Sequence, residues 1–128
     1  CIHWFDLPAF FKEAQRVLKP GGVLAFWTYN YGIFQGPKAD SLNALFVDLY
    51  DKQLGNYWTS NRKLVERKYQ DIIPVGLENE TRLEVSMKYT MSLDHFIGYL
   101  DTWSALKEYR KVHPNDPILE RFKDKFVI

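Results

Sequence analysis

The sequence has few of the features that mark disulfide-stabilised, membrane or nucleic-acid-binding proteins. One cysteine in 128 residues excludes an internal disulfide and favours a reducing compartment, for which we expect the cytoplasm. No apolar run approaches the roughly 20 residues of a membrane span. Seventeen Lys and Arg residues against sixteen Asp and Glu residues leave a formal net charge of +1, so the basic surface of a nucleic-acid binder is missing. We therefore expect neither a membrane nor a nucleic acid as a partner.

The motifs of several catalytic chemistries are also missing. The three histidines have no metal-ligand spacing and no neighbouring cysteine pair, so we expect no metal. Cys1 has no sequence context that would activate its thiol, and no serine lies in a nucleophile elbow. Gly21 and Gly22 follow a predicted helix and precede a predicted strand, which reverses the order found in a phosphate-binding glycine loop. No residue is assigned a catalytic role.

The sequence does contain patterns typical of helices and strands in alternation. Asp6 and Pro8 are typical of a helix start, and apolar residues then recur at helical spacing. Gly21 permits a left-handed exit turn. The near-continuous apolar run at residues 23–29 is typical of a strand covered on both faces. Residues 82–91 alternate between apolar and polar, which predicts a strand with one buried face.

Further helices are expected between and after these strands. One should begin at Asp40 or Ser41, and another should cover residues 61–71 with Val65, Tyr69 and Ile72 facing inward. The apolar positions of the first of these helices are Leu42, Leu45, Phe46, Leu49, Tyr50 and Leu54. Ser92 is a good cap for a third helix, and a fourth should begin near Asp116. This order of elements predicts the α/β fold class.

Two motifs, His3-Trp4-Phe5-Asp6 and Leu18-Lys19-Pro20-Gly21-Gly22, resemble the second half of a class I S-adenosylmethionine-dependent methyltransferase. The resemblance is to the subfamily that includes the trans-aconitate methyltransferases, with looser support at residues 57–58 and 98–104. It implies a partial Rossmann-like methyltransferase fold. Residues 23–29 and 82–91 would be its strands five and six, and helical insertions would form a substrate lid.

The resemblance also implies three segments. Residues 1–36 would be the carboxyl-terminal part of the cofactor domain, residues 37–80 a helical lid insertion, and residues 81–128 strand six with a late helical segment. The family's glycine-rich loop and the acidic residue that ends its second strand are not in this sequence. Since the sequence also begins at Cys1 rather than at a methionine, we expect a fragment that is inactive alone. S-adenosylmethionine would bind to the full-length protein.

The candidate site residues follow from the resemblance, because ligands bind beyond the carboxyl ends of the strands in open α/β sheets. His3 and Trp4 would contact the cofactor, whose sulfonium cation is stabilised by aromatic faces. The candidates for binding the substrate are Phe5, Tyr29, Tyr99, Trp103, Arg62 and Arg67. The two arginines are included because a guanidinium pairs with a carboxylate through two hydrogen bonds. Core packing for the aromatic residues, and a solvated helix face for the arginines, are the competing interpretations.

The function expected from these residues is methyl transfer from S-adenosylmethionine to a small molecule, with a carboxylate of a small organic acid as the favoured acceptor. The alternative is a methyltransferase-like module that binds or interacts without catalysis. The strands that should flank residues 23–29 and 82–91 are absent from the sequence. Unpaired strand edges recruit other chains, so we also expect a dimer or larger assembly, joined through strand edges or exchanged helices around residues 23–29, or else aggregation.

Overall fold

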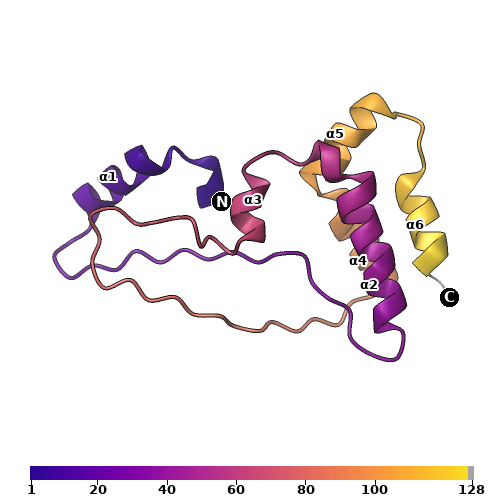
Figure 1. Ribbon diagram of the computed structural model, residues 1–128, viewed down its shortest axis with the longest axis horizontal. Coiled ribbons are helices and arrows are strands. Elements are labelled where there is room, and N and C mark those ends of the chain that lie inside the picture. Colours follow the sequence, from indigo (N-terminus) through magenta and orange to yellow (C-terminus); the bar gives the residue numbers. More distant parts are fainter. Residues whose placement is uncertain (127–128) are drawn as a thin grey trace. The chain divides into compact units, whose positions relative to one another are not determined.

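The computed structural model describes residues 1–126 (Figure 1). The chain forms two compact units, each made of two stretches of sequence. Unit 1 contains residues 1–31 and 60–86, and unit 2 contains residues 32–59 and the chain from Met87 onward. The three-segment division inferred from the resemblance stays a prediction. No helix in the part of the chain described has the length and apolar character needed to cross a membrane.

The predicted α/β, Rossmann-like fold is wrong for residues 1–126, which contain helices and no β-strand. The segments expected as strands five and six run through unpaired chain (Figure 1). In residues 23–29 the side chains alternate between half-buried and exposed, and in residues 82–91 all ten residues are exposed. The alternating pattern identifies the face that pairing would bury. It does not supply the neighbouring strand whose backbone groups must complete the ladder.

Unit 1 begins with the short 3-10 helix η1 (Ile2–Trp4) and the helix α1 (Leu7–Val17). The start of α1 is confirmed, because the Asp6 carboxylate accepts a hydrogen bond from the Ala9 backbone N–H at 3.2 Å. Val17 was expected to face inward but is 60% exposed. The chain leaves the helix through Gly21, whose φ of 74° is the left-handed conformation expected there.

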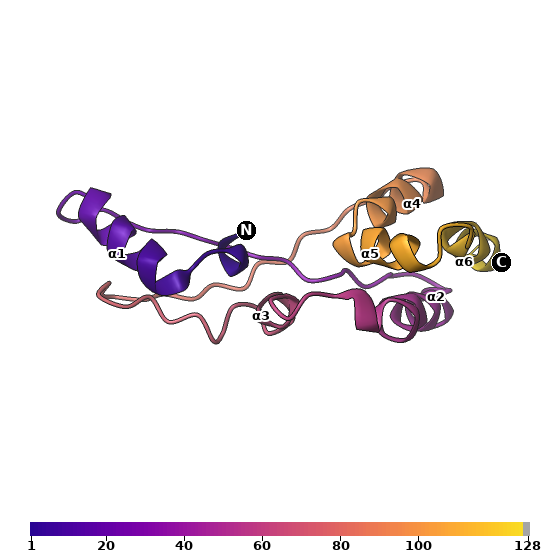
Figure 2. The same cartoon turned by 90° about the horizontal axis from the view of Figure 1, so that it is seen from above.

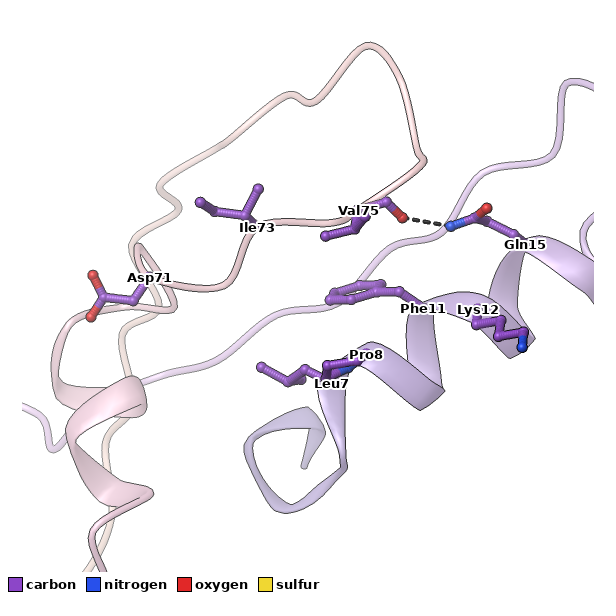
Figure 3. A pocket seen from close by; sticks show the side chains of 8 residues that line it. All are labelled: Leu7, Pro8, Phe11, Lys12, Gln15, Asp71, Ile73 and Val75. Atoms are coloured by element: carbon purple, nitrogen blue, oxygen red, sulfur yellow. Dashed lines mark hydrogen bonds between the residues drawn. The ribbon is translucent and has the colours of Figure 1, made fainter.

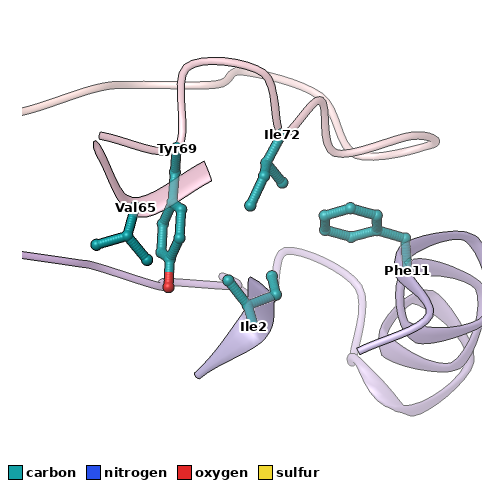
Figure 4. Packing of buried hydrophobic residues seen from close by; sticks show 5 residues of the cluster. All are labelled: Ile2, Phe11, Val65, Tyr69 and Ile72. Atoms are coloured by element: carbon teal, nitrogen blue, oxygen red, sulfur yellow. The ribbon is translucent and has the colours of Figure 1, made fainter. Parts of the chain in front are cut away.

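The core of unit 1 joins the first helices to the residues around α3 (Arg62–Glu66) (Figure 4). Its buried members are Ile2, Phe11, Val65, Tyr69 and Ile72. The last three were expected to face inward, and their burial is confirmed. The helix predicted over residues 61–71 is nevertheless too long. It ends at Glu66, and Lys68 and Tyr69 then adopt left-handed angles, with φ of 53° and 59°.

Arg82 stabilises this turn from outside the helix. Its guanidinium donates to the backbone carbonyls of Tyr69, at 2.8 Å, and Ile72, at 2.9 Å. It also pairs with the carboxylate of Glu80. A planar guanidinium can satisfy two carbonyls at once, so Arg82 holds the chain that presents the Tyr69 side chain to the core.

Unit 2 begins with α2 (Ala39–Val47), which continues as the π-helix η2 (Asp48–Gln53) and the 3-10 helix η3 (Gly55–Tyr57). Lys38 lies at the cap position, so the predicted caps Asp40 and Ser41 fall inside the first turns of the helix. Of its six predicted apolar positions, Leu42 and Leu45 are half-buried, and the other four, Phe46, Leu49, Tyr50 and Leu54, are buried.

Three more helices complete unit 2: α4 (Leu93–Asp101), α5 (Ser104–Val112) and α6 (Ile118–Phe126). The predicted cap of α4 is confirmed, because Ser92 Oγ accepts from the His95 backbone N–H at 3.2 Å. Figure 2 shows α2 on one side of this unit and α4, α5 and α6 on the other. Aromatic rings fill the space between them; Phe46, for example, contacts the rings of Phe96 and Trp103.

Candidate functional site

Two hydrogen-bonded pairs of polar side chains lie in unit 1, His3 with Tyr69 and Arg62 with Asn30, and we call them together the His3 cluster. The Nδ1 atom of His3 and the hydroxyl of Tyr69 share a hydrogen bond of 2.6 Å. Nη2 of Arg62 donates to Oδ1 of Asn30 at 3.2 Å. The charge of Arg62 also acts on the imidazole of His3. The cluster thus joins the amino-terminal loop, the start of α3 and the chain at residue 30.

Local structure explains how each member of the cluster is positioned. The single turn of η1 is closed by the Trp4 N–H, which donates to the carbonyl of Cys1 at 3.0 Å, and its buried residue Ile2 anchors it in the core. Tyr69 is directed to His3 by the left-handed turn after α3. Asn30 is held by a hydrogen bond of 2.8 Å from the backbone N–H of Tyr31 to its side-chain oxygen.

The electrostatics of the cluster favour a neutral histidine. Burial lowers the pKa of His3 below its ordinary value of 6.5, and the positive charge of Arg62 lowers it further. At neutral pH the imidazole is therefore uncharged and can accept or donate a hydrogen bond. The cluster offers an imidazole, a phenol, an amide and a guanidinium. This set suits a small polar or anionic group.

Two aromatic side chains lie beside the cluster and remain open to solvent. Trp4 is 54% exposed, and its ring centre lies 5.1 Å from that of His3 at an angle of 44°. Phe5 is about half exposed and packs against Phe10. An open indole face beside an uncharged imidazole is a suitable environment for a soft cation such as a sulfonium.

The roles of the other predicted site residues stay predictions. Tyr29 is an exposed residue of unit 1. Arg67 forms an ion pair with Asp71, at 2.9 Å between Nε and Oδ2. Tyr99 and Trp103 belong to unit 2, where Trp103 is 8% exposed and packs among aromatic rings. The structure thus gathers His3, Trp4 and Arg62.

A pocket of about 360 Å³ also lies in unit 1, between α1 and the chain that follows α3 (Figure 3). Its lining residues are Leu7, Pro8, Phe11, Lys12, Gln15, Asp71, Ile73 and Val75. Gln15 Nε2 donates to the carbonyl of Val75 at 2.5 Å and so links the two walls. The lining is mostly apolar and includes none of the predicted site residues. Sixty positions separate the two linked residues, so no local sequence signal could have predicted the pocket.

Within residues 1–126 there is no group of three or more His, Cys, Asp or Glu residues that could hold a metal ion. Sequence reasoning also did not select Tyr69 as a site residue. Its inward position was predicted from helical spacing, but its partner His3 lies 66 positions away. Only the fold reveals that the two side chains meet.

Comparison with known proteins points to the methyltransferases. The chain is similar to a protein of Dictyostelium discoideum named "Putative methyltransferase", with 33% identity over 119 residues. The match covers 92% of this chain but 44% of the Dictyostelium protein, so the chain spans less than half the length of that relative. No family model matches the chain, and no solved structure matches it. The similarity supports a methyltransferase in general and gives no support to the trans-aconitate subfamily.

Proposed function

We propose that this chain is part of a methyltransferase that uses S-adenosylmethionine to methylate a small molecule. The observation that carries the proposal is the 33% identity over 119 residues with a protein that bears a methyltransferase name. The match extends over 92% of the chain, so it does not depend on one short motif. The motifs around His3 and Gly21 resemble the same class of protein.

The residues of the chain fit one end of the cofactor. The half-exposed Trp4 ring offers an aromatic face to a sulfonium, and the lowered pKa of His3 keeps the neighbouring imidazole uncharged. When bound, S-adenosylmethionine supplies an electrophilic methyl group. The glycine-rich loop and the acidic residue that hold the nucleoside end in the resembled family are not in this sequence. We propose that residues outside these 128 provide those contacts.

The acceptor proposed for this site is a carboxylate of a small organic acid. Arg62 is the favoured partner for it, because its guanidinium lies in the His3 cluster and can bind a carboxylate through two parallel hydrogen bonds. Arg67, whose guanidinium pairs with Asp71, is the second candidate. Phe5 and Tyr29 are proposed to supply apolar surface near the acceptor.

The test uses the longest natural chain that contains this sequence. Transfer of a labelled methyl group from S-adenosylmethionine to a panel of small carboxylic acids should be detected. The variant Trp4→Ala should lower kcat/KM by about tenfold or more without changing the melting temperature, since an aromatic face on a desolvated cation is worth about 2 kcal/mol. Trp27→Ala is the matched control, because Trp27 is another exposed tryptophan of unit 1.

Three outcomes would count against the proposal: no methyl transfer to any acid, a Trp4→Ala rate equal to the unmodified rate, or a loss of rate that only follows unfolding. Absence of both methyl transfer and cofactor binding in the longer chain would favour the non-catalytic module instead. The 128-residue chain alone should bind S-adenosylmethionine more weakly than about 10 μM, the tighter end of enzyme substrate affinities, because most of the contacts to the cofactor lie outside it.

A further inference from the structure

Residues 82–91 form a continuous exposed segment that joins the two units. All ten residues are exposed, and their apolar members alternate with polar ones. The apolar members are Leu83, Val85, Met87, Tyr89 and Met91. No ladder of backbone hydrogen bonds pairs this segment within residues 1–126. An unpaired run of this kind offers donors and acceptors to another chain.

The segment is complementary to itself when two copies run in opposite directions. With Ser86 facing Ser86 of the other copy, each Glu84 faces Lys88 of the other copy. On the apolar side, Leu83 then faces Tyr89 and Val85 faces Met87. Opposite charges and apolar pairs directly across two strands are stabilising. Both charge pairs and both kinds of apolar pair form in this single register.

Other arrangements of the same two segments lose these pairs. In a parallel pairing in register, Glu84 faces Glu84 and Lys88 faces Lys88, and like charges directly opposite each other are destabilising. An antiparallel shift of two residues in one direction places Arg82 opposite Lys88, and in the other direction it places Glu84 opposite Thr90. A shift of one residue turns apolar side chains toward the polar face.

We propose that a second copy of this chain binds antiparallel along residues 82–91 and forms a two-fold symmetric pair centred on Ser86. A two-fold contact uses the same surface on both copies, which is what a self-complementary segment provides. The carboxylate of Glu84 also accepts from Lys68 Nζ at 2.5 Å. A carboxylate has two oxygens that accept several hydrogen bonds, so Glu84 can pair with Lys68 and with Lys88 of the other copy.

This proposal assigns the expected self-association to residues 82–91 and to an antiparallel pairing of two copies. Residues 23–29 are the poorer choice, because Leu24 and Phe26 already pack against the core of unit 1. The proposal does not depend on methyl transfer. A pairing of this length belongs to the weak, transient class of interfaces, so it should appear at micromolar concentrations and dissociate on dilution.

Cross-linking tests the centre of the pair. In a Cys1→Ser background, which removes the exposed native thiol, Ser86→Cys should form a disulfide-linked dimer under mild oxidation. Residues directly opposite each other in antiparallel strands have Cα atoms about 4.5 to 5.5 Å apart, within disulfide range. Thr81→Cys is the control, because five residues on each side of the centre place its two copies about 33 Å apart. Equal cross-linking of both variants would overturn the proposal.

Charge reversal tests the direction and register. Sedimentation of the 128-residue chain up to about 300 μM, a range suited to weak interfaces, should show a reversible dimer. Glu84→Lys alone or Lys88→Glu alone should abolish it, and the double variant should restore it. The double variant still loses the ion pair between position 84 and Lys68, so restoration reports the contact between copies. Lys107→Glu, an exposed position on α5, should leave the dimer unchanged. A monomer at every concentration, or a dimer indifferent to the single reversals, would overturn the proposal.

Discussion

The helices of unit 2 bury aromatic residues between them, whereas the extended segments at residues 23–29 and 82–91 leave apolar side chains in contact with solvent. The difference follows from where backbone hydrogen bonds are made. A helix satisfies its N–H and C=O groups within its own segment, so α2, α4, α5 and α6 need only side-chain contacts with each other. An extended segment needs a second segment for the same purpose. Residues 82–91 lack one, and their apolar side chains stay exposed.

The largest expected contrast comes from removing the same side chain in the two environments. Leu100→Ala in α4 should lower the free energy of unfolding by about 2 to 5 kcal/mol, because Leu100 has no exposed surface and its truncation leaves a cavity. Leu83→Ala should change it by less than about 0.5 kcal/mol, because Leu83 is 84% exposed. Denaturant unfolding followed by circular dichroism, at a dilution at which the proposed pair is dissociated, measures both. Equal losses would mean that Leu83 is covered in solution.

A smaller effect is expected at the turn between α5 and α6 in unit 2. The Tyr109 hydroxyl donates to Oδ2 of Asp116 at 2.6 Å, and this bond together with burial raises the pKa of Tyr109. Tyr109→Phe should cost about 1.5 kcal/mol in the same unfolding experiment, as for a hydrogen bond to a charged group.

The Tyr109→Phe substitution should also raise the pKa of Asp116. Hydrogen bonds from Arg121 first and from Tyr109 second lower this pKa in the unmodified chain. Tyr29→Phe, at an exposed tyrosine, is the control. NMR titration of the carboxyl groups measures this pKa. An Asp116 pKa that Tyr109→Phe leaves unchanged would contradict the hydrogen bond between Tyr109 and Asp116.

In unit 1 a comparable effect should come from the backbone alone. Gly21 has a φ of 74°, and a Cβ atom built there meets no atom within 4 Å. Gly21→Val should therefore destabilise the chain by roughly 1 to 3 kcal/mol through strain of a β-branched residue in the left-handed region. Gly21→Asn should retain most of the stability, since asparagine tolerates that region. Equal melting temperatures for the valine and glycine forms would show that the turn adopts ordinary angles in solution.

The smallest expected effect is a pH dependence of unit 1 that depends on His3. Its pKa in the folded chain lies below the ordinary 6.5, so the unfolded state binds more protons as the pH falls below that value. Stability should then decrease from about pH 7.5 to about pH 5.5. His3→Gln should flatten this decrease, and His95→Gln in α4 should not. An unmodified chain equally stable at both values would contradict the environment described for His3.

Local signals in the sequence predicted several local structures correctly. Asp6 and Ser92 cap the helices expected of them, and Gly21 makes a left-handed turn, because each depends on a few neighbouring residues. The strand predictions were wrong. The alternation in residues 82–91 indicates which side chains would be buried in a sheet, but it does not show that a neighbouring strand is present to pair with the segment. The helix over residues 61–71 was extended too far, since nothing in the sequence marks Lys68 and Tyr69 as left-handed.

The candidate site was predictable only in part, for a similar reason. The aromatic loop indicated His3 and Trp4, and the structure places Arg62 beside them. The hydrogen bond between His3 and Tyr69 joins positions 66 apart, and no periodic pattern carries such information. The role of Trp103 was not predictable for a different reason. A tryptophan at helical spacing gives the same sequence pattern whether it lies in a core or in a binding site.

The π-helix η2 has a consequence for how the length of this chain can vary. The Leu54 N–H donates to the carbonyl of Leu49, five residues earlier, at 3.0 Å, so the turn holds one residue more than an α-helical turn. Deleting a residue between Asp48 and Gln53 would remove that extra residue and restore α-helical bonding, while the residues after it would keep nearly their present orientation. Leu54 would then stay in the core. In aligned relatives that share this packing, a gap of one residue should be tolerated in this stretch, whereas a gap within α2 should not.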